Sequence, residues 1–202
     1  MPSKDHAGAF AQLLGSGVEF NATFTYRVQE SASGLAYAVG LAEPFVGKDN
    51  FMVIFGDNII FDDLSEHVRM FEGGAKVFLK QVSDPHRHGI AELNGTKVTH
   101  IEEKPANPKS DWAAVGVYLF DGHAFDYIKE LKPSPRGELE ITDLNNRYIK
   151  EARMEAGFLQ EPWFDAGTHE SLVEAAASIR DMHRPVERIR VSSTLSPNVT
   201  AG

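Results

Sequence analysis

Two aspartates of this sequence each follow a separate run of apolar residues. Asp57 follows the apolar residues 51–55, with a glycine before it and an asparagine after it, and Asp165 follows two aromatic residues. Ligands of open α/β sheets collect at the carboxyl ends of strands, and Mg²⁺ takes one or two carboxylates and completes its shell with water and phosphates. We therefore predict that both aspartates hold one Mg²⁺. The alternatives are a Gly-Asp-Asn turn for Asp57 and an acid at a helix N-terminus for Asp165.

Other segments carry groups suited to a sugar phosphate or a nucleotide base. Glu103 and Lys104 are adjacent, so in an extended chain they point to opposite sides and could take hydroxyls and a phosphate separately; the alternative is a solvated turn. Arg136, in a proline-rich loop, could bind a phosphate through paired hydrogen bonds or remain solvated. Gln29 begins a stretch of small residues to position 36, where a flat base could lie against the backbone; the alternative is a plain Ser-Gly loop.

Composition limits the class of protein. The chain has 202 residues, 42% of them hydrophobic and 24% charged, which suits one globular domain. A net charge of −9 argues against a nucleic-acid surface, and the lack of cysteine excludes disulfides and thiolate nucleophiles. No apolar run is long enough to span a bilayer, and the N-terminus lacks a signal peptide's apolar core. We expect a cytoplasmic protein with no membrane partner.

Apolar patterns predict alternating strands and helices. Strands are expected at residues 24–28, 51–55, 75–81, 90–93, 98–101 and 112–120, and helices at 10–14, 35–42, 64–71, 125–131, 144–149 and 168–181. Asn94-Gly95 predicts a hairpin turn, and Ser171 with Glu174 matches a capping box. The order predicts an α/β three-layer sandwich with a mostly parallel, Rossmann-like sheet over residues 1–181, followed by a flexible tail at 182–202.

Five segments, in this order, resemble the sugar-1-phosphate nucleotidyltransferases, and most closely the glucose-1-phosphate thymidylyltransferases. They are residues 34–36, 56–59, 102–105, 136–143 and 163–169. The resemblance implies the nucleotide-diphospho-sugar transferase fold and transfer of a nucleotidyl group from dTTP, or UTP, to glucose-1-phosphate. The products would be dTDP-glucose and pyrophosphate, made by a homo-oligomer in the dTDP-rhamnose pathway.

The same resemblance assigns roles to individual residues. Asp57 and Asp165 would be the catalytic Mg²⁺ ligands, and Gln29 and Gly34 would contact the base. Glu103 and Gly89 would bind sugar hydroxyls, Lys104 and Arg136 the sugar phosphate, and Val115 would line the sugar pocket. His88 would be a further substrate-binding residue. His88 departs from the family, which usually has a tyrosine before this glycine.

The sequence departs from the family most at its N-terminus. The family opens with a strand and a Gly-x-Gly-Thr-Arg loop that wraps the triphosphate, followed by a Lys-Pro segment, and none of these is present in the N-terminal part of this sequence. Without that strand, the sheet is expected to expose an apolar edge. The chain is therefore either a fragment or truncated copy of a longer enzyme, or a shortened homologue that acts as a non-catalytic binding or regulatory subunit.

Overall fold

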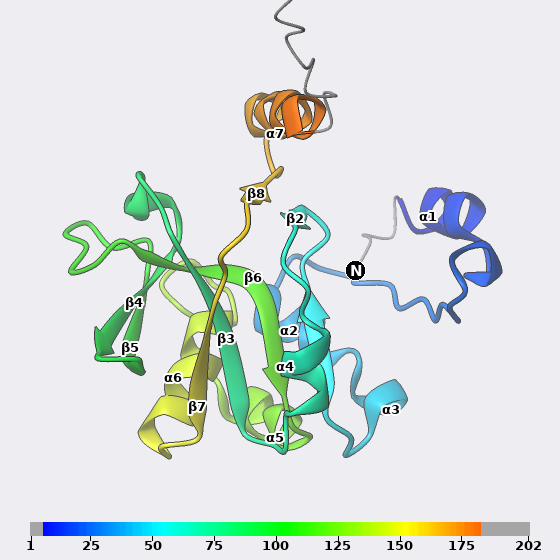
Figure 1. Cartoon of the computed structure of the whole chain (residues 1–202). Coiled ribbons are helices and arrows are strands. Elements are labelled where there is room, and N and C mark those ends of the chain that lie inside the picture. The colour runs from blue at the N-terminus through cyan, green and yellow to red at the C-terminus, as the bar shows by residue number, and fades with distance from the viewer. Residues whose placement is uncertain (1–5, 183–202) are drawn as a thin grey trace, which may run out of the picture.

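The computed structural model describes residues 6–182 and shows a central sheet with helices on both faces (Figure 1). The strands are β1 (Phe51–Ile54), β2 (Asn58–Ile60), β3 (Ala75–Gln81), β4 (Gly89–Asn94), β5 (Lys97–Glu103), β6 (Trp112–Phe120), β7 (Met154–Phe158) and β8 (Trp163–Asp165). The helices are α1 (Ala7–Leu14), α2 (Leu35–Gly40), α3 (Glu43–Val46), α4 (Ser65–Arg69), α5 (His123–Glu130), α6 (Ile141–Lys150) and α7 (His169–Met182). Short 3₁₀ turns, η1 (Val18–Phe20) and η2 (Pro85–Arg87), complete the described elements.

Two hydrophobic clusters fill the two faces of the sheet. The larger one joins α2, α5 and α6 to the face that carries Val77, Leu79 and Tyr118. The smaller one joins Phe78 and Val117, on the opposite face, to Leu64 and Phe71, which flank α4. The alternation of neighbouring β3 residues between the clusters follows from the two-residue period of a strand. The predicted three-layer α/β sandwich is therefore confirmed.

Most strands of this sheet share one direction, yet most of the strand pairs are antiparallel. The order is β5-β4-β6-β3-β7. Strand β1 pairs with residues 117–120 of β6, beyond residues 113–114, where β4 pairs with the same strand. Strands β1, β3, β4 and β7 share one direction, as a mostly parallel sheet requires, but β6 runs against them between β1 and β3. Consequently the β3–β7 ladder is parallel, whereas the ladders that β6 forms are antiparallel. The predicted β4–β5 hairpin is confirmed, with Asn94 paired to Lys97 across the turn.

Strand β1 has a free edge in the described part of the chain. It pairs there with β6 alone, and Ile54 is 54% exposed. The prediction that residues 51–55 are covered on both faces is thus wrong for Ile54, whereas the expected exposed apolar edge is present. An unpaired edge presents backbone donors and acceptors to solvent.

The N-terminal arm differs from its prediction. Helix α1 forms and ends at Gly15, but Phe10 and Leu13 are 46% and 77% exposed because the helix stands away from the sheet (Figure 1). The segment 24–28 is extended but is not part of a ladder in the structure. Alternating apolar residues favour a strand, yet a strand also requires a neighbour to pair with.

Helix α7 also lies apart from the sheet, at the end of β8 (Figure 1). Its N-terminal cap lies three residues earlier than predicted, at Thr168. The Thr168 hydroxyl accepts from the Ser171 N–H at 3.1 Å, and the Ser171 hydroxyl accepts from the Thr168 N–H at 3.0 Å. Ser171 and Glu174 therefore do not form the predicted capping box. Leu172, expected on an apolar face, is 50% exposed. The tail from residue 183 lies outside the described residues.

Candidate active site

A tight turn between β1 and β2 presents Asp57. The Phe55 N–H donates to the Gly116 carbonyl of β6 at 2.8 Å, and the Asn58 N–H donates back to the Phe55 carbonyl at 3.1 Å. The turn is thereby tied to the central strand while the Asp57 side chain stays exposed. A β-carbon on Gly56 would meet no protein atom within 4 Å, so the space beside the turn is open.

The β2–β8 ladder carries Asp165 to the same place. Asn58 pairs with Asp165, and the Ala166 N–H donates to the Asp57 carbonyl at 2.8 Å. A β-carbon built on Gly167 would lie 2.9 Å from Asp165 Oδ1 and 3.3 Å from Asp57 Oδ2. Both carboxylates therefore face one small volume next to Gly167.

The donor set at this volume fits Mg²⁺. No group of three or more His, Asp or Glu side chains within residues 6–182 could enclose a metal ion. An exposed carboxylate, Asp57, beside the partly buried carboxylate of Asp165 suits an ion that keeps several waters and takes phosphate oxygens from a substrate. Asp57 and Asp165 would hold the ion, and the remaining positions would be left for ligand and water.

Filling the space beside Gly167 should weaken cation binding. In Gly167→Ala, the added methyl would lie between the two carboxylates, so we expect the Kd for Mn²⁺ to rise about tenfold, as when metal ligands are misoriented. Gly167 is exposed, so the melting temperature should barely change. Titration followed by Mn²⁺ electron paramagnetic resonance measures the effect. Gly8→Ala, in open space on α1, is the control, and equal Kd values for both variants would contradict the placement of the ion.

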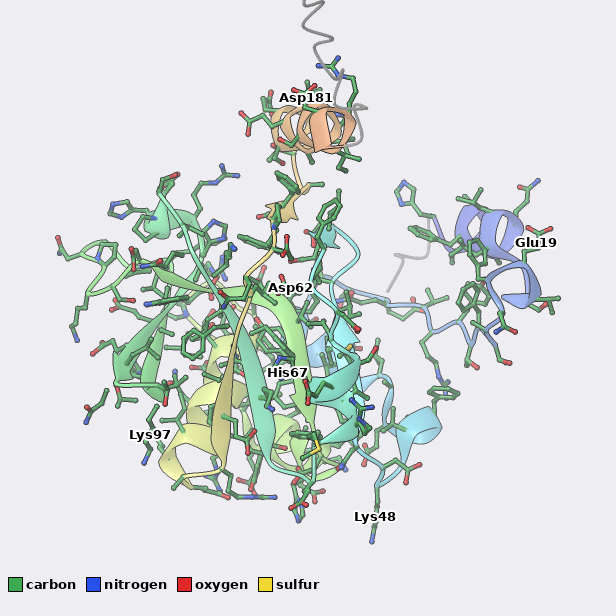
Figure 2. The ribbon with its side chains drawn as sticks, viewed as in Figure 1. Glu19, Lys48, Asp62, His67, Lys97 and Asp181 are labelled. Atoms are coloured by element: carbon green, nitrogen blue, oxygen red, sulfur yellow. The ribbon has the colours of Figure 1, made fainter. Side chains whose placement is uncertain are left out.

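The loop that precedes β8 is held from two sides. The Asp62 carboxylate accepts from the Gln160 and Glu161 N–H groups at 2.9 and 3.0 Å. The Lys80 ammonium donates to the Gln160 and Glu161 carbonyls, both at 2.9 Å, and to a third carbonyl. Figure 2 shows Asp62 at the β2 end of the sheet, away from Lys48 and Lys97. These contacts fix the start of β8 and so the position of Asp165.

A cavity of about 780 Å³ lies beside β1 and α2 and contains the predicted nucleotide residues. Gln29, Gly34 and Asp57 line it together with Glu138 and a set of apolar side chains. Gly34 has φ 100°, and a β-carbon there would collide with the Leu139 carbonyl, so the position requires glycine. Gln29 and Gly34 thus line the same cavity as Asp57.

A second cluster joins Glu103 to three other groups. Gly89 pairs with Glu103 in the β4–β5 ladder, and a β-carbon on Gly89 would lie 3.3 Å from Glu103 Oε2. The buried Thr142 hydroxyl donates to the same oxygen at 2.7 Å. Arg136 Nη2 lies 4.0 Å from Glu103 Oε1. Glu103 is therefore oriented by α6 while one of its oxygens faces the Arg136 loop.

The two predicted phosphate cations differ in their surroundings. Arg136 is 47% exposed and donates to both Glu140 carboxylate oxygens at 3.0 and 2.9 Å, which raises the pKa of the guanidinium. Its guanidinium also lies 3.6 Å from Glu138, so a phosphate there would compete with carboxylates. Lys104 is exposed and its backbone has φ 45°, a conformation that non-glycine residues rarely adopt and that concentrates at functional sites.

His88 packs against the first residue of β8. Its ring meets the Trp163 ring edge to face at 5.5 Å between centroids. Burial lowers the pKa of His88, although the charges of Asp165 and Glu103 oppose that shift. The lowered pKa favours the neutral imidazole, which can donate or accept a hydrogen bond.

Val115 is placed differently from the other predicted residues. Its side chain is 0% exposed and packs in the smaller core cluster with Phe78 and Leu159. Direct contact with a sugar would require neighbouring side chains to move, so lining the sugar pocket stays a prediction. Four candidate residues have no assigned role from the sequence: Asn58, Glu138, Thr142 and Trp163. All four lie in segments that carry the resemblance, namely 56–59, 136–143 and 163–169.

The chain belongs to the nucleotidyl transferase family, whose model matches residues 2–182. The fold and the paired carboxylates described above agree with that assignment. Solved UDP-glucose pyrophosphorylases share the fold, with a TM-score of 0.75 at 21% identity for one in complex with UDP-glucose.

Relatives named glucose-1-phosphate thymidylyltransferase resemble the chain more strongly. One from Neisseria meningitidis is 43% identical over 85% of this chain and 62% of its own length, and one from Xanthomonas campestris is 45% identical over 83% and 59%. A crystal structure from Bacillus anthracis, described as such an enzyme in complex with sucrose, superposes with a TM-score of 0.84 at 50% identity, covering 91% of this chain and 76% of that one. The chain thus spans about three fifths of the length of these curated relatives. No helix among residues 6–182 is long and apolar enough to cross a membrane.

Proposed function

We propose that this chain forms a nucleotidyl transfer site for dTTP or UTP and glucose-1-phosphate. The observation that carries the proposal is the placement of Asp57 and Asp165 at one volume, with the cavity of Gln29 and Gly34 on one side. The Glu103 cluster would bind the sugar phosphate, and the neighbouring His88 ring contacts Trp163 of β8. The names of the relatives support glucose-1-phosphate and a thymidine nucleotide as the pair.

In the proposed reaction, a phosphate oxygen of the sugar-1-phosphate forms a bond to the α-phosphorus of the nucleoside triphosphate. The bond from that phosphorus to the oxygen bridging to the β-phosphate breaks, and pyrophosphate leaves with its electron pair. The product is the nucleoside diphosphate sugar. Positioning and charge neutralisation supply the catalysis, since no covalent intermediate is required.

Each side of the site has a part in this reaction. Gln29 hydrogen-bonds the edge of thymine or uracil, and Gly34 lets the base approach the backbone. Glu103, held by Thr142, binds sugar hydroxyls beside Gly89. Lys104 and Arg136 bind the sugar phosphate, for which Arg136 would exchange part of its contact with Glu140. Mg²⁺, when held by Asp57 and Asp165, would neutralise charge on the reacting phosphates.

The proposal is tested by following the reaction itself. Purified chain with dTTP, glucose-1-phosphate and Mg²⁺ should release pyrophosphate and form dTDP-glucose, measured by ³¹P nuclear magnetic resonance, and Asp57→Asn should not. No turnover, with glucose-1-phosphate still raising the melting temperature, would contradict transfer and indicate a binding or regulatory subunit. Cytoplasmic location, assembly as a homo-oligomer and a place in dTDP-rhamnose synthesis remain predictions.

A further inference from the structure

Asn58 has a hydrogen-bonding partner at each end of its side-chain amide. It is half-buried, and its Oδ1 accepts from the Gly116 N–H of β6 at 3.1 Å and from Trp163 Nε1 at 2.7 Å. Its Nδ2 donates to Asp57 Oδ1 at 2.8 Å. The side chain therefore connects the central strand, the β8 strand and the Asp57 carboxylate.

The two donors decide which way the amide faces. The Gly116 N–H and the indole N–H can only donate, so the group between them must be the amide oxygen. The amide nitrogen is then left to face Asp57. A reversed amide would set N–H groups against N–H groups on one side and an oxygen against a carboxylate on the other. The orientation of the Asn58 donor toward Asp57 is thus fixed by residues on two other strands.

The backbone at Gly116 is also fitted to this amide. A β-carbon at position 116 would collide with Asn58 Nδ2 and would lie 2.7 Å from the Phe55 ring. Trp163 and Asp165 are two residues apart on β8 and so point to the same face of the β2–β8 ladder, where Asn58 pairs with Asp165. One strand therefore supplies both a metal-side carboxylate and the indole that orients Asn58.

We propose that Asn58 is a positioning residue, which fixes the Asp57 carboxylate and, through Trp163, its placement relative to Asp165. The proposal rests on the proposed function, because it assumes that the two carboxylates hold a divalent cation. Groups that hydrogen-bond a metal-ligating carboxylate orient it, and losing them typically costs about 10–100-fold in metal affinity. Without the link, the carboxylate would retain its charge and lose its fixed direction.

The experiment compares two tryptophan variants. Trp163→Phe removes the donor to Asn58 and keeps most of the packing, whereas Trp112→Phe removes an indole that contacts Phe158 and has no link to Asn58. Mn²⁺ alone is the probe, because it prefers the same oxygen ligands as Mg²⁺. We expect Trp163→Phe to raise the Mn²⁺ Kd about tenfold, with Trp112→Phe unchanged and both melting temperatures similar.

Asn58→Leu provides a second variant, for which the Kd should rise by about 10–100-fold. If Asn58→Leu does not fold, the Mn²⁺ Kd of Trp163→Phe alone tests the positioning role. Unchanged Mn²⁺ affinity in Trp163→Phe, while Asp165→Asn abolishes binding, would overturn the positioning role and leave the metal site intact. If Asp165→Asn binds Mn²⁺ as tightly as the wild-type chain does, that result would instead overturn the metal site, and the positioning role with it.

Discussion

Asp165→Asn is expected to abolish divalent-cation-dependent binding of dTTP. The substitution keeps the size of the side chain but removes one of the two carboxylates that face the Gly167 volume. Because loss of an outer partner already costs about 10–100-fold in metal affinity, loss of a direct ligand should cost more than that. Isothermal titration of dTTP with and without Mg²⁺ measures the difference.

Asp49→Asn is the matched control for this experiment. It makes the same change of charge at an exposed position between α3 and β1, outside the site. The control should bind dTTP as the wild-type chain does, with the same dependence on Mg²⁺. If Asp165→Asn retained Mg²⁺-dependent binding, Asp165 could not be a ligand of the ion.

A large loss of stability is expected from Asp121→Ala. Asp121 is 7% exposed, and its carboxylate accepts from the Gly74 N–H and the Tyr148 hydroxyl, both at 2.8 Å, and pairs with Arg153. Removing the carboxylate leaves the buried Gly74 N–H and Tyr148 hydroxyl without their acceptor, which typically costs about 1–3 kcal/mol for each unsatisfied group. Urea denaturation gives the change in the free energy of unfolding.

The pH dependence of unfolding provides a second observation on the same residue. Burial raises the pKa of Asp121, but hydrogen bonds from Gly74 and Tyr148 and the charge of Arg153 outweigh burial, so the pKa lies below its usual value. A depressed carboxyl pKa stabilises the fold above the unfolded-state pKa, and that stabilisation is lost as the pH falls through the folded-state pKa. Asp121→Asn should therefore flatten the acid limb of the stability curve. Asp126→Asn, exposed on α5, should leave that limb unchanged; equal curves for the two variants would contradict the account.

The elements that the sequence predicts best are those with strong local signals. Strands β3 and β6 have the predicted bounds. Strand β6 is a continuous apolar run, and β3 has an apolar centre, Val-Phe-Leu, that becomes buried in the sheet. The β4–β5 hairpin follows from Asn94-Gly95, whose φ of 63° at the glycine suits a tight turn. Local chemistry alone is sufficient for these elements.

Elements that depend on distant neighbours are harder to predict. Strand β7 has a weak pattern, Met-Glu-Ala-Gly-Phe, and forms because β3 supplies a parallel partner. Its Gly157 lies against the Phe78 ring, where a β-carbon would be only 2.7 Å from Cδ1. Conversely, residues 24–28 have the alternation of a strand but no ladder partner in the described structure. Pairing, which is a tertiary property, decides both cases.

The same distinction applies to the site. Asp57 and Asp165 could be predicted because each follows an apolar run, and the β2–β8 ladder brings them together. Asn58 and Trp163 are not predictable in this way, since their roles depend on a hydrogen bond between residues more than a hundred positions apart. Contacts of this kind arise only once the strands are placed.

The central claim is that one divalent cation binds between Asp57 and Asp165. The most direct measurement is anomalous scattering from a crystal of the chain grown with Mn²⁺ and dTTP. The account predicts an anomalous peak beside Gly167, contacted by both carboxylates and by phosphate oxygens of the nucleotide. A peak bound by the nucleotide phosphates but by neither aspartate, or nucleotide bound outside the Gln29 cavity, would contradict it.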